Sequence, residues 1–236
     1  MDKTEHIIKI LKANRDFFAK IIDIEFSEKN VHVFDFSDKN IDLYDIDLAS
    51  TEALTNLVFE KLKKEKKKVG VGGYLEDRLI YKRSSLFDND DEPRSIHLGI
   101  DIWLEAGTPI YSPLPGVIHS FKRNNEFGDY GPTLILEHLI EGETFYTLYG
   151  HLSLYSIENK EKGQQVRRGD TIAYIGDENI NGNWPPHLHF QVITDLLGNE
   201  GDFPGVAPAS AREYFQKLCI DPNYILKINS LLPFIE

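Results

Sequence analysis

The residues best suited to chemistry are two histidines separated by a single apolar residue, His187 and His189. They open a run of β-forming residues, and alternate residues of a strand point to the same face. Their Cα atoms would lie roughly 6.6 Å apart, because a strand rises about 3.3 Å per residue. One metal ion could therefore be bound by one imidazole and flanked by the other.

Three upstream residues, His97, Asp101 and His151, could complete such a centre. On a straight strand His97 and Asp101 would share a face but lie about 13 Å apart, too far for one ion bound at about 2 Å. Gly99 lies between them and can supply the bend that brings both side chains to one point. His151 follows Gly150 at the end of an aromatic run. We expect all three side chains to converge on the histidine pair.

The types of these side chains fit a catalytic zinc centre. Two histidines and one carboxylate, here His97, Asp101 and His189, form a shell that leaves one position open for water. The remaining histidines, His151 and His187, can then act as general base or acid and as stabilisers of an oxyanion. The sequence thus predicts one Zn²⁺ per chain held by the first three residues.

The elements that position these residues are of two kinds. Apolar residues recur at helical spacing over residues 5–22, and again after Ser50, a residue type that favours the helix N-cap. From about residue 95 to 195, short β-branched and aromatic runs alternate with turn residues, which indicates an antiparallel β-sandwich or barrel. We expect strands at Leu98–Trp103, Pro109–Tyr111, Gly116–Phe121, Thr133–His138, Phe145–Tyr149, Thr171–Ile175 and His187–Thr194. The predicted fold class is α+β, mainly an antiparallel β-sandwich catalytic core with an N-terminal helical segment.

Four segments are expected along the chain. They are an α-rich N-terminal segment, a connector, the β catalytic domain and a loop-and-helix tail, at residues 1–70, 71–94, 95–195 and 196–236. Gly70-Val71-Gly72-Gly73 breaks the preceding pattern and is interpreted as a hinge, because it lacks the flanking strand and helix of a nucleotide-binding loop. Residues 71–92 directly precede the first candidate ligand, and we hypothesise that they lie over the groove as a lid or inhibitory segment.

Composition excludes several classes of protein. The formal net charge of −12 over 236 residues argues against a nucleic-acid partner, because phosphate binding needs a basic face. No apolar run reaches transmembrane length and no signal peptide is readable, so the sequence predicts a cytoplasmic protein without membrane insertion. Cys219 is the single cysteine, so an internal disulfide is impossible. The oligomeric state is left open.

Three motifs together resemble one known family. They are His97-x-x-x-Asp101, Tyr149-Gly150-His151-Leu152 and Pro186-His187-Leu188-His189-Phe190. They resemble the lysostaphin/LytM-type zinc metallopeptidases of family M23 over about residues 93–195. This resemblance implies a zinc ion that acidifies a bound water and polarises the scissile carbonyl, with His151 and His187 as the catalytic histidines. It also implies a peptide or peptidoglycan substrate and, by family habit, a periplasmic or extracellular location.

One wall of the expected groove departs from that family. Many relatives approach the histidine pair through a turn rich in Gly, Ser and Thr, whereas this chain has Trp184-Pro185-Pro186. We name Trp184 and Tyr130 as candidate substrate-binding residues. Residues 73–81, 131–133, 184–186 and 202–205 are more similar to a subgroup, the M23-like domains found beside kinase-like and aminotransferase domains. That similarity opens the alternative of an amide substrate outside the cell wall.

Two other kinds of protein compete with the enzyme. A non-catalytic zinc-binding or regulatory module on the same fold would typically have lost ligands, whereas every ligand position is filled here. A lipoyl- or biotinyl-type carrier would need an acceptor lysine on an exposed hairpin, and none is convincing. The prediction is therefore a zinc metalloendopeptidase.

Overall fold

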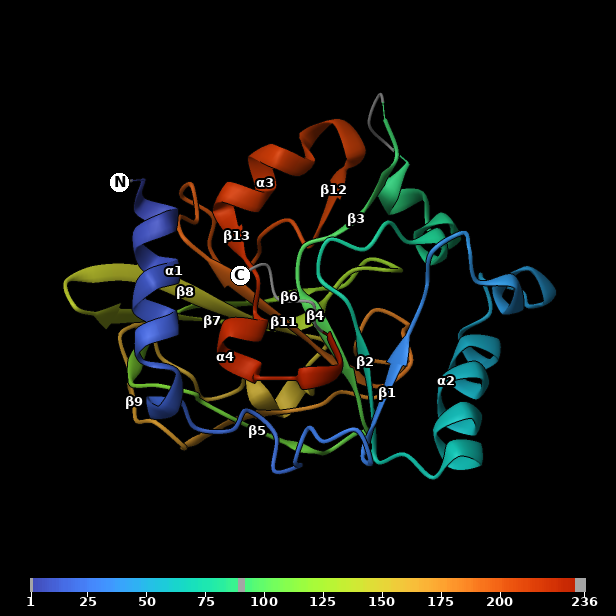
Figure 1. Cartoon of the computed structure of the whole chain (residues 1–236), viewed down its shortest axis with the longest axis horizontal. Coiled ribbons are helices and arrows are strands. Elements are labelled where there is room, and N and C mark those ends of the chain that lie inside the picture. Colours follow the sequence, from blue (N-terminus) through green and yellow to red (C-terminus); the bar gives the residue numbers. More distant parts are fainter. Residues whose placement is uncertain (1, 89–91, 232–236) are drawn as a thin grey trace.

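The computed structural model describes residues 2–88 and 92–231, and its centre is a nine-stranded sheet (Figure 1). The strand order is β1-β2-β4-β11-β8-β7-β6-β9, and β13 pairs with β11. These strands span Val31–Phe34, Val69–Gly72, Ile100–Trp103, His187–Ile193, Glu143–Gly150, Gly131–Ile140, Gly116–Asn124, Gln165–Val166 and Cys219–Ile220, respectively. β1 and β2 are parallel and the other pairs are antiparallel, which confirms the predicted fold class.

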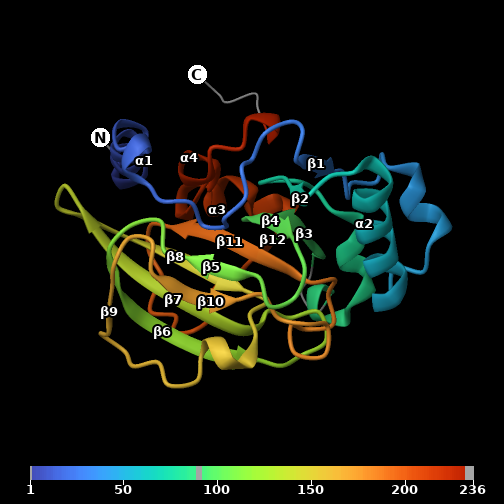
Figure 2. The same ribbon diagram turned by 90° about the horizontal axis from the view of Figure 1, so that it is seen from below.

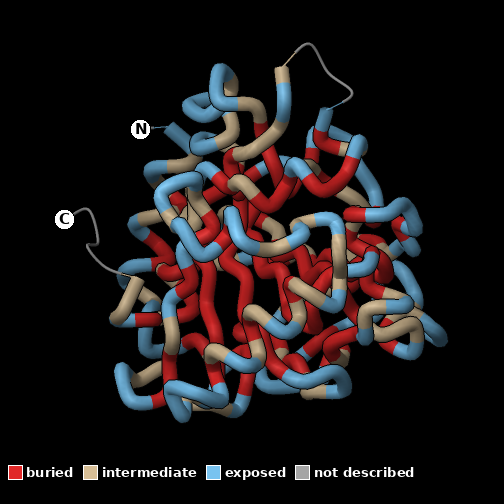
Figure 3. The backbone as a smooth tube through the Cα atoms, turned by 90° about the vertical axis from the view of Figure 1, so that its right-hand side faces the viewer, coloured by how far each residue is buried: buried red, intermediate tan, exposed pale blue. Residues whose placement is uncertain are grey.

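Two small sheets cover the two faces of the large one, because alternate residues of its central strands are apolar on both sides. β5 (Pro109–Tyr111) pairs with β10 (Thr171–Tyr174), and Ile110 of β5 shares a core with Leu134 of β7. β3 (Arg94–His97) pairs with β12 (Val206–Pro208), and Ile96 of β3 shares a second core with Ile135 of β7. The buried strands fill the middle of the molecule and exposed segments form its rim (Figure 3).

The α-helices α1 to α4 span Lys3–Ala13, Thr51–Glu65, Arg212–Leu218 and Asn223–Leu226. In Figure 2, α1, α3 and α4 lie toward the top of the view and α2 lies at the right beyond β2, whereas β6 and β9 lie at the lower left. Short 3-10 turns lie at Arg15–Phe17, Ile41–Asp45, Leu79–Arg83, Ser85–Phe87, Leu154–Ser156, Ala209–Ala211 and Asn229–Leu231. Among the residues that the structure describes, none of these helices combines the length and apolarity needed to cross a bilayer.

Local sequence patterns predict most of these elements. All seven strands expected between residues 98 and 194 are present, and Ser50 caps α2 by accepting a hydrogen bond from Ala53 N at 3.1 Å. The helix expected over residues 5–22 is wrong beyond Ala13, where α1 ends. Ile21 is buried as its spacing predicts, but its carbonyl accepts from Tyr111 N of β5 at 2.8 Å. The edge of a strand therefore replaces the helical hydrogen bonds there.

The hinge interpretation of residues 70–73 was also wrong, because β2 includes Gly70 and Gly72 and lies between β1 and β4. A Cβ atom on Gly70 would lie 2.4 Å from the Phe34 ring, and one on Gly72 would lie 2.6 Å from the Trp103 ring. The glycines therefore permit close packing of large side chains against a strand backbone. The division of the chain into four segments stays a prediction.

We expect Gly72→Ala to destabilise the protein, because the new methyl group would overlap Trp103 and the Arg78 guanidinium. Overpacking of this kind costs about 1–3 kcal/mol. Gly73→Ala is the matched control, since a Cβ atom there meets nothing within 4 Å. Its effect should stay within about 0.5 kcal/mol. The free energies of unfolding, measured in denaturant, test this difference, and equal values for the two variants would contradict the packing argument.

Buried His138 on β7 makes the stability depend on pH. Its Nδ1 donates to Pro115 O at 2.9 Å, its Nε2 accepts from Thr147 Oγ1 at 2.7 Å, and burial lowers its pKa from 6.5 to about 4. The unfolded chain binds this proton near pH 6.5 but the folded protein only near pH 4, so stability falls as pH drops through that window. We expect His138 to lower the free energy of unfolding by up to about 3 kcal/mol over that pH range.

The comparison that isolates this loss is with His138→Asn, which keeps a donor for Pro115 O and removes the titrating group. Its free energy of unfolding should fall less steeply between about pH 7 and pH 4 than that of the wild type. Identical slopes would show that the folded protein protonates His138 as readily as the unfolded chain does.

Candidate metal centre and active site

Three predicted ligands from different strands meet at one point. His97 ends β3, Asp101 lies in β4, and His189 lies directly opposite Asp101 in the antiparallel β4–β11 pair. His97 Nε2 is 3.0 Å from His189 Nδ1 and 3.2 Å from Asp101 Oδ1, and the last two atoms are 3.0 Å apart. All three side chains are buried, and together they could hold a metal ion.

Gly99 makes this convergence possible in two ways. Leu98 and Gly99 separate β3 from β4, so the chain turns between His97 and Asp101 instead of carrying them apart along one strand. Gly99 also lies against the third ligand, because a Cβ atom there would be 2.6 Å from His189 Cε1. A side chain at this position would displace the imidazole.

Hydrogen bonds on the far side of each imidazole fix its tautomer. His97 Nδ1 donates to Gly73 O at 2.9 Å, and His189 Nε2 donates to Gln191 Oε1 at 3.0 Å. The Gln191 amide is oriented in turn, since its Nε2 donates to Pro204 O at 3.1 Å. Each histidine therefore turns a nitrogen lone pair toward the other and toward the Asp101 carboxylate.

This set of donors fits a bound cation. With the tautomers that the Gly73 and Gln191 hydrogen bonds favour, three lone-pair atoms face one another at 3.0–3.2 Å, and a cation between them would remove their mutual repulsion. Tetrahedral zinc, with ligands at about 2.0–2.2 Å, separates those ligands by about 3.3–3.6 Å. The observed triangle is therefore close to the one that such an ion requires.

The two oxygens of Asp101 have different partners. Oδ1 faces the histidines, whereas Oδ2 accepts from Arg78 Nη1. Burial alone would raise the pKa of Asp101, but His97 and Arg78 hold it well below its usual range. Burial, reinforced by Arg78, lowers the pKa of His97 to about 4. Near neutral pH the site thus combines an ionised carboxylate with a neutral His97.

The predicted catalytic histidines lie side by side, with ring centroids 4.1 Å apart. His151 Nδ1 donates to Asn181 O at 2.8 Å and His187 Nδ1 donates to Pro185 O at 2.6 Å, so Nε2 of each ring is the available proton acceptor. Burial lowers the pKa of His187 to about 4 and that of His151 well below its ordinary value. His151 has a φ of +61°, a strained conformation that the surrounding structure must hold.

A cavity of about 310 Å³ opens onto the site, and both predicted substrate-binding residues line it. The Tyr130 hydroxyl lies 3.4 Å from His189 Nε2, and burial raises the pKa of Tyr130, so it remains a neutral phenol. Trp184 is fixed by its Nε1, which donates to Gly128 O at 3.0 Å. The structure therefore places both aromatic residues in the cavity beside the histidines, and their role in substrate binding stays a prediction.

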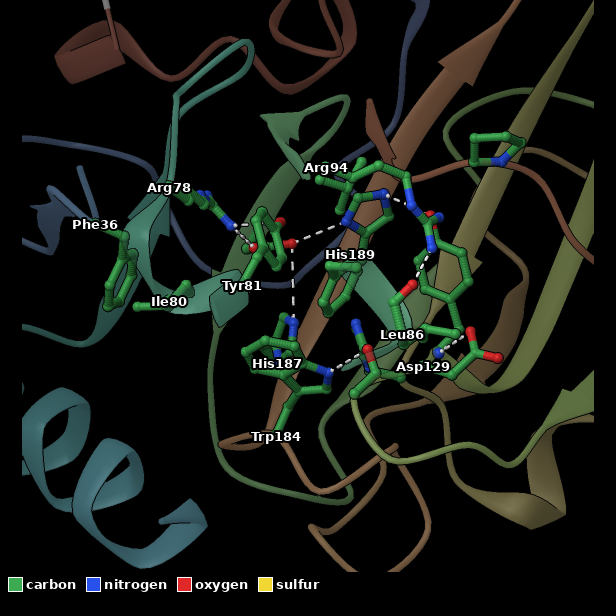
Figure 4. Close-up of a pocket in the computed structure, with 18 of the residues that line it drawn as sticks. Phe36, Arg78, Ile80, Tyr81, Leu86, Arg94, Asp129, Trp184, His187 and His189 are labelled. Atoms are coloured by element: carbon green, nitrogen blue, oxygen red, sulfur yellow. Dashed lines mark hydrogen bonds and ion pairs between the residues drawn. The ribbon is translucent and has the colours of Figure 1, made fainter. Parts of the chain in front are cut away.

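The opposite wall of this cavity comes from the N-terminal part of the chain, of which only residues 71–92 were connected with the site by the sequence. Its lining residues are Phe36, Leu54, Val58, Ile80, Tyr81, Leu86 and Phe87. They lie after β1, on α2 and in the 3-10 turns of residues 79–87 (Figure 4). Part of the segment 71–92 is thus a wall of the cavity, and its role as a lid stays a prediction.

Two polar residues that contact the predicted ligands, Gln191 and Arg78, were not predicted from the sequence. Gln191 follows His189 by two residues, so strand alternation alone would have placed it on the same face. Arg78 has no such signal, because it reaches Asp101 across 23 positions and through a buried contact.

Comparisons with known proteins match part of this chain to a family of peptidases. The model of Peptidase family M23 matches residues 95–200. The chain is 34% identical over 98 residues to the peptidoglycan DD-endopeptidase ShyA of Vibrio cholerae, which covers 41% of this chain and 20% of that protein. It is 29% identical over 115 residues to the L-Ala--D-Glu endopeptidase of Bacillus subtilis. This match covers 47% of this chain and 33% of that protein. A zinc-containing peptidase from Vibrio cholerae, known from its crystal structure, aligns at 32% identity over 42% of this chain and 27% of that one, with a TM-score of 0.33.

The chain spans between a fifth and a third of the length of these curated relatives. The matched region, residues 95–200, includes all five histidine and aspartate positions described above, whereas Arg78 and the apolar wall lie outside it. Residues 95–200 of this chain therefore match peptidase family M23.

Proposed function

We propose that this chain is a zinc-dependent metalloendopeptidase that hydrolyses a peptide bond in peptidoglycan-type peptides. The observation that carries the proposal is the triangle of buried lone-pair donors at 3.0–3.2 Å, beside a pair of histidines in contact. His97, Asp101 and His189 would hold one Zn²⁺. The family of the domain supports this activity, and the names of its relatives support the substrate class. For that substrate, the place of action would be the cell wall.

The remaining residues supply proton transfer and orientation. Bound zinc would supply the Lewis acidity that activates a water molecule and polarises the scissile carbonyl. His151 or His187, neutral near pH 7, would accept the proton of the attacking water at Nε2 and later donate it to the leaving amine. Asp101 Oδ1 lies 3.8 Å from His187 Nε2, so its charge would stabilise the imidazolium formed there. The pair would also stabilise the developing oxyanion.

The apolar wall favours a second candidate substrate class. Phe36, Ile80 and Phe87 line that wall with apolar surface, and each is already packed in a buried apolar cluster with Trp103 and Trp184. An amide substrate with an apolar group would find a matching surface there. This alternative agrees with the predicted resemblance to M23-like domains of larger proteins, which itself stays a prediction.

Substitution of the histidines should separate metal binding from chemistry. We expect His189→Ala to lose zinc and peptidase activity together, because it removes a ligand. His187→Ala and His151→Ala should keep zinc near one per chain but lower kcat/KM by roughly 10²–10⁴-fold, the usual contribution of general acid–base catalysis. His119→Ala, on the same sheet but outside the site, should keep both properties.

Zinc content by atomic spectroscopy and turnover of peptidoglycan and its stem peptides are the two measurements. Zinc bound without cleavage of any wall peptide would contradict the wall substrate and favour the regulatory module or another amide. A wild-type protein that binds no zinc would contradict the metal site itself.

A further inference from the structure

We propose that Arg78 is a positioning residue of the metal centre, supplied from outside the matched domain. It would hold the outer oxygen of Asp101 so that only the inner oxygen faces the metal. This inference rests on the proposed function, because it requires that His97, Asp101 and His189 bind a metal. It adds to that function a dependence of the metal centre on the segment between β2 and β3.

The environment of Arg78 leaves its guanidinium little freedom to move. The residue is 2% exposed, and its Cζ atom lies 5.7–6.0 Å from the ring centroids of Phe36, Tyr81 and Trp103. Gly72 provides the room beneath it, since a Cβ atom there would be 2.5 Å from Arg78 Nη2. A buried cation surrounded by aromatic rings needs anionic partners, and a buried charge left unpaired is strongly destabilising.

Two carboxylates provide those partners. Arg78 Nη1 donates to Asp101 Oδ2, and Nε donates to Glu76 Oε2 at 2.7 Å. Glu76 is itself anchored, because its Oε1 accepts from Phe36 N at 2.8 Å. Glu76 can therefore balance the charge of Arg78, which leaves the negative charge of Asp101 available to the metal. The fixed spacing of the guanidinium nitrogens also sets the angle between the two carboxylates.

The same short segment holds a second ligand. Gly73 O accepts from His97 Nδ1, Leu75 N donates to His97 O at 2.8 Å, and His97 N donates to Glu76 O at 2.9 Å. Residues 73–78 thus bind both the backbone and the ring of His97 and, through Arg78, the carboxylate of Asp101. The geometry of two of the three ligands depends on a segment outside the matched domain.

The test uses Arg78→Lys and Arg78→Met in the full chain. The lysine substitution keeps a positive charge but cannot span both carboxylates at fixed angles, and the methionine substitution removes the charge. We expect zinc affinity, measured by competition with a chromogenic chelator, to fall about 10–100-fold in both variants, the usual effect of removing an outer partner of a ligand. The visible absorption of the Co²⁺-substituted protein should change as well, because it reports ligand geometry.

Arg83→Met is the matched control. Arg83 comes from the same segment, is also buried, and stacks 4.5 Å from the Trp184 ring while donating to Thr51 Oγ1, without touching the predicted ligands. The Arg83→Met substitution also removes a buried guanidinium group, so it reproduces the loss of stability that such a removal causes anywhere in the protein. We expect zinc affinity and the Co²⁺ spectrum of this variant to match the wild type.

Glu76→Gln provides a second route if the Arg78 variants do not fold. It leaves Arg78 in place but removes the balancing charge, so zinc affinity should fall several-fold. Wild-type zinc affinity and Co²⁺ spectra in folded Arg78 variants would overturn the proposal, as would unchanged affinity in Glu76→Gln if those variants are unfolded. A wild-type protein that binds no metal would instead refute the proposed function, and this inference with it.

Discussion

The register between β4 and β11 is the constraint on which the site depends. It sets Asp101 directly opposite His189 and sets Trp103 opposite His187. A slip of one residue would turn the histidines to the other face of the sheet, into the core that Leu188 and Phe190 now fill. Because that core is apolar and buried, the alternative register is strongly disfavoured. The packing of the sandwich therefore brings His97, Asp101 and His189 together without the help of a metal ion.

Burial of so many polar groups requires compensation, and the structure provides it through hydrogen bonds on the outer side of each group. The backbone carbonyls of Gly73, Asn181 and Pro185 accept from three of the four imidazoles, and Gln191 accepts from the fourth. These contacts satisfy one nitrogen of each ring and leave the other nitrogen for the metal or for a proton. The same interactions that make burial tolerable thus orient the chemistry.

The N-terminal part of the chain contributes to the large sheet, to the cavity wall and to the surroundings of Asp101. β2 joins the large sheet beside β4, α2 and the turns of residues 79–87 wall the cavity, and Arg78 contacts Asp101. These features lie outside the matched residues 95–200. For the proposed enzyme, substrate selection is accordingly the property most open to divergence from the relatives, whereas the three proposed metal ligands lie within the matched residues.

The sequence by itself determined what local periodicity can encode. Alternation placed His187 and His189 on one face, spacing located the seven strands of the β domain, and Ser50 marked the start of α2. Only the tertiary structure decided that Gly70 and Gly72 lie in a strand, that α1 ends at Ala13, and that Arg78 reaches Asp101. The physical reason is the same in each case. The hydrogen-bond partner, the space or the counter-charge comes from a segment distant in sequence, and no local pattern records it.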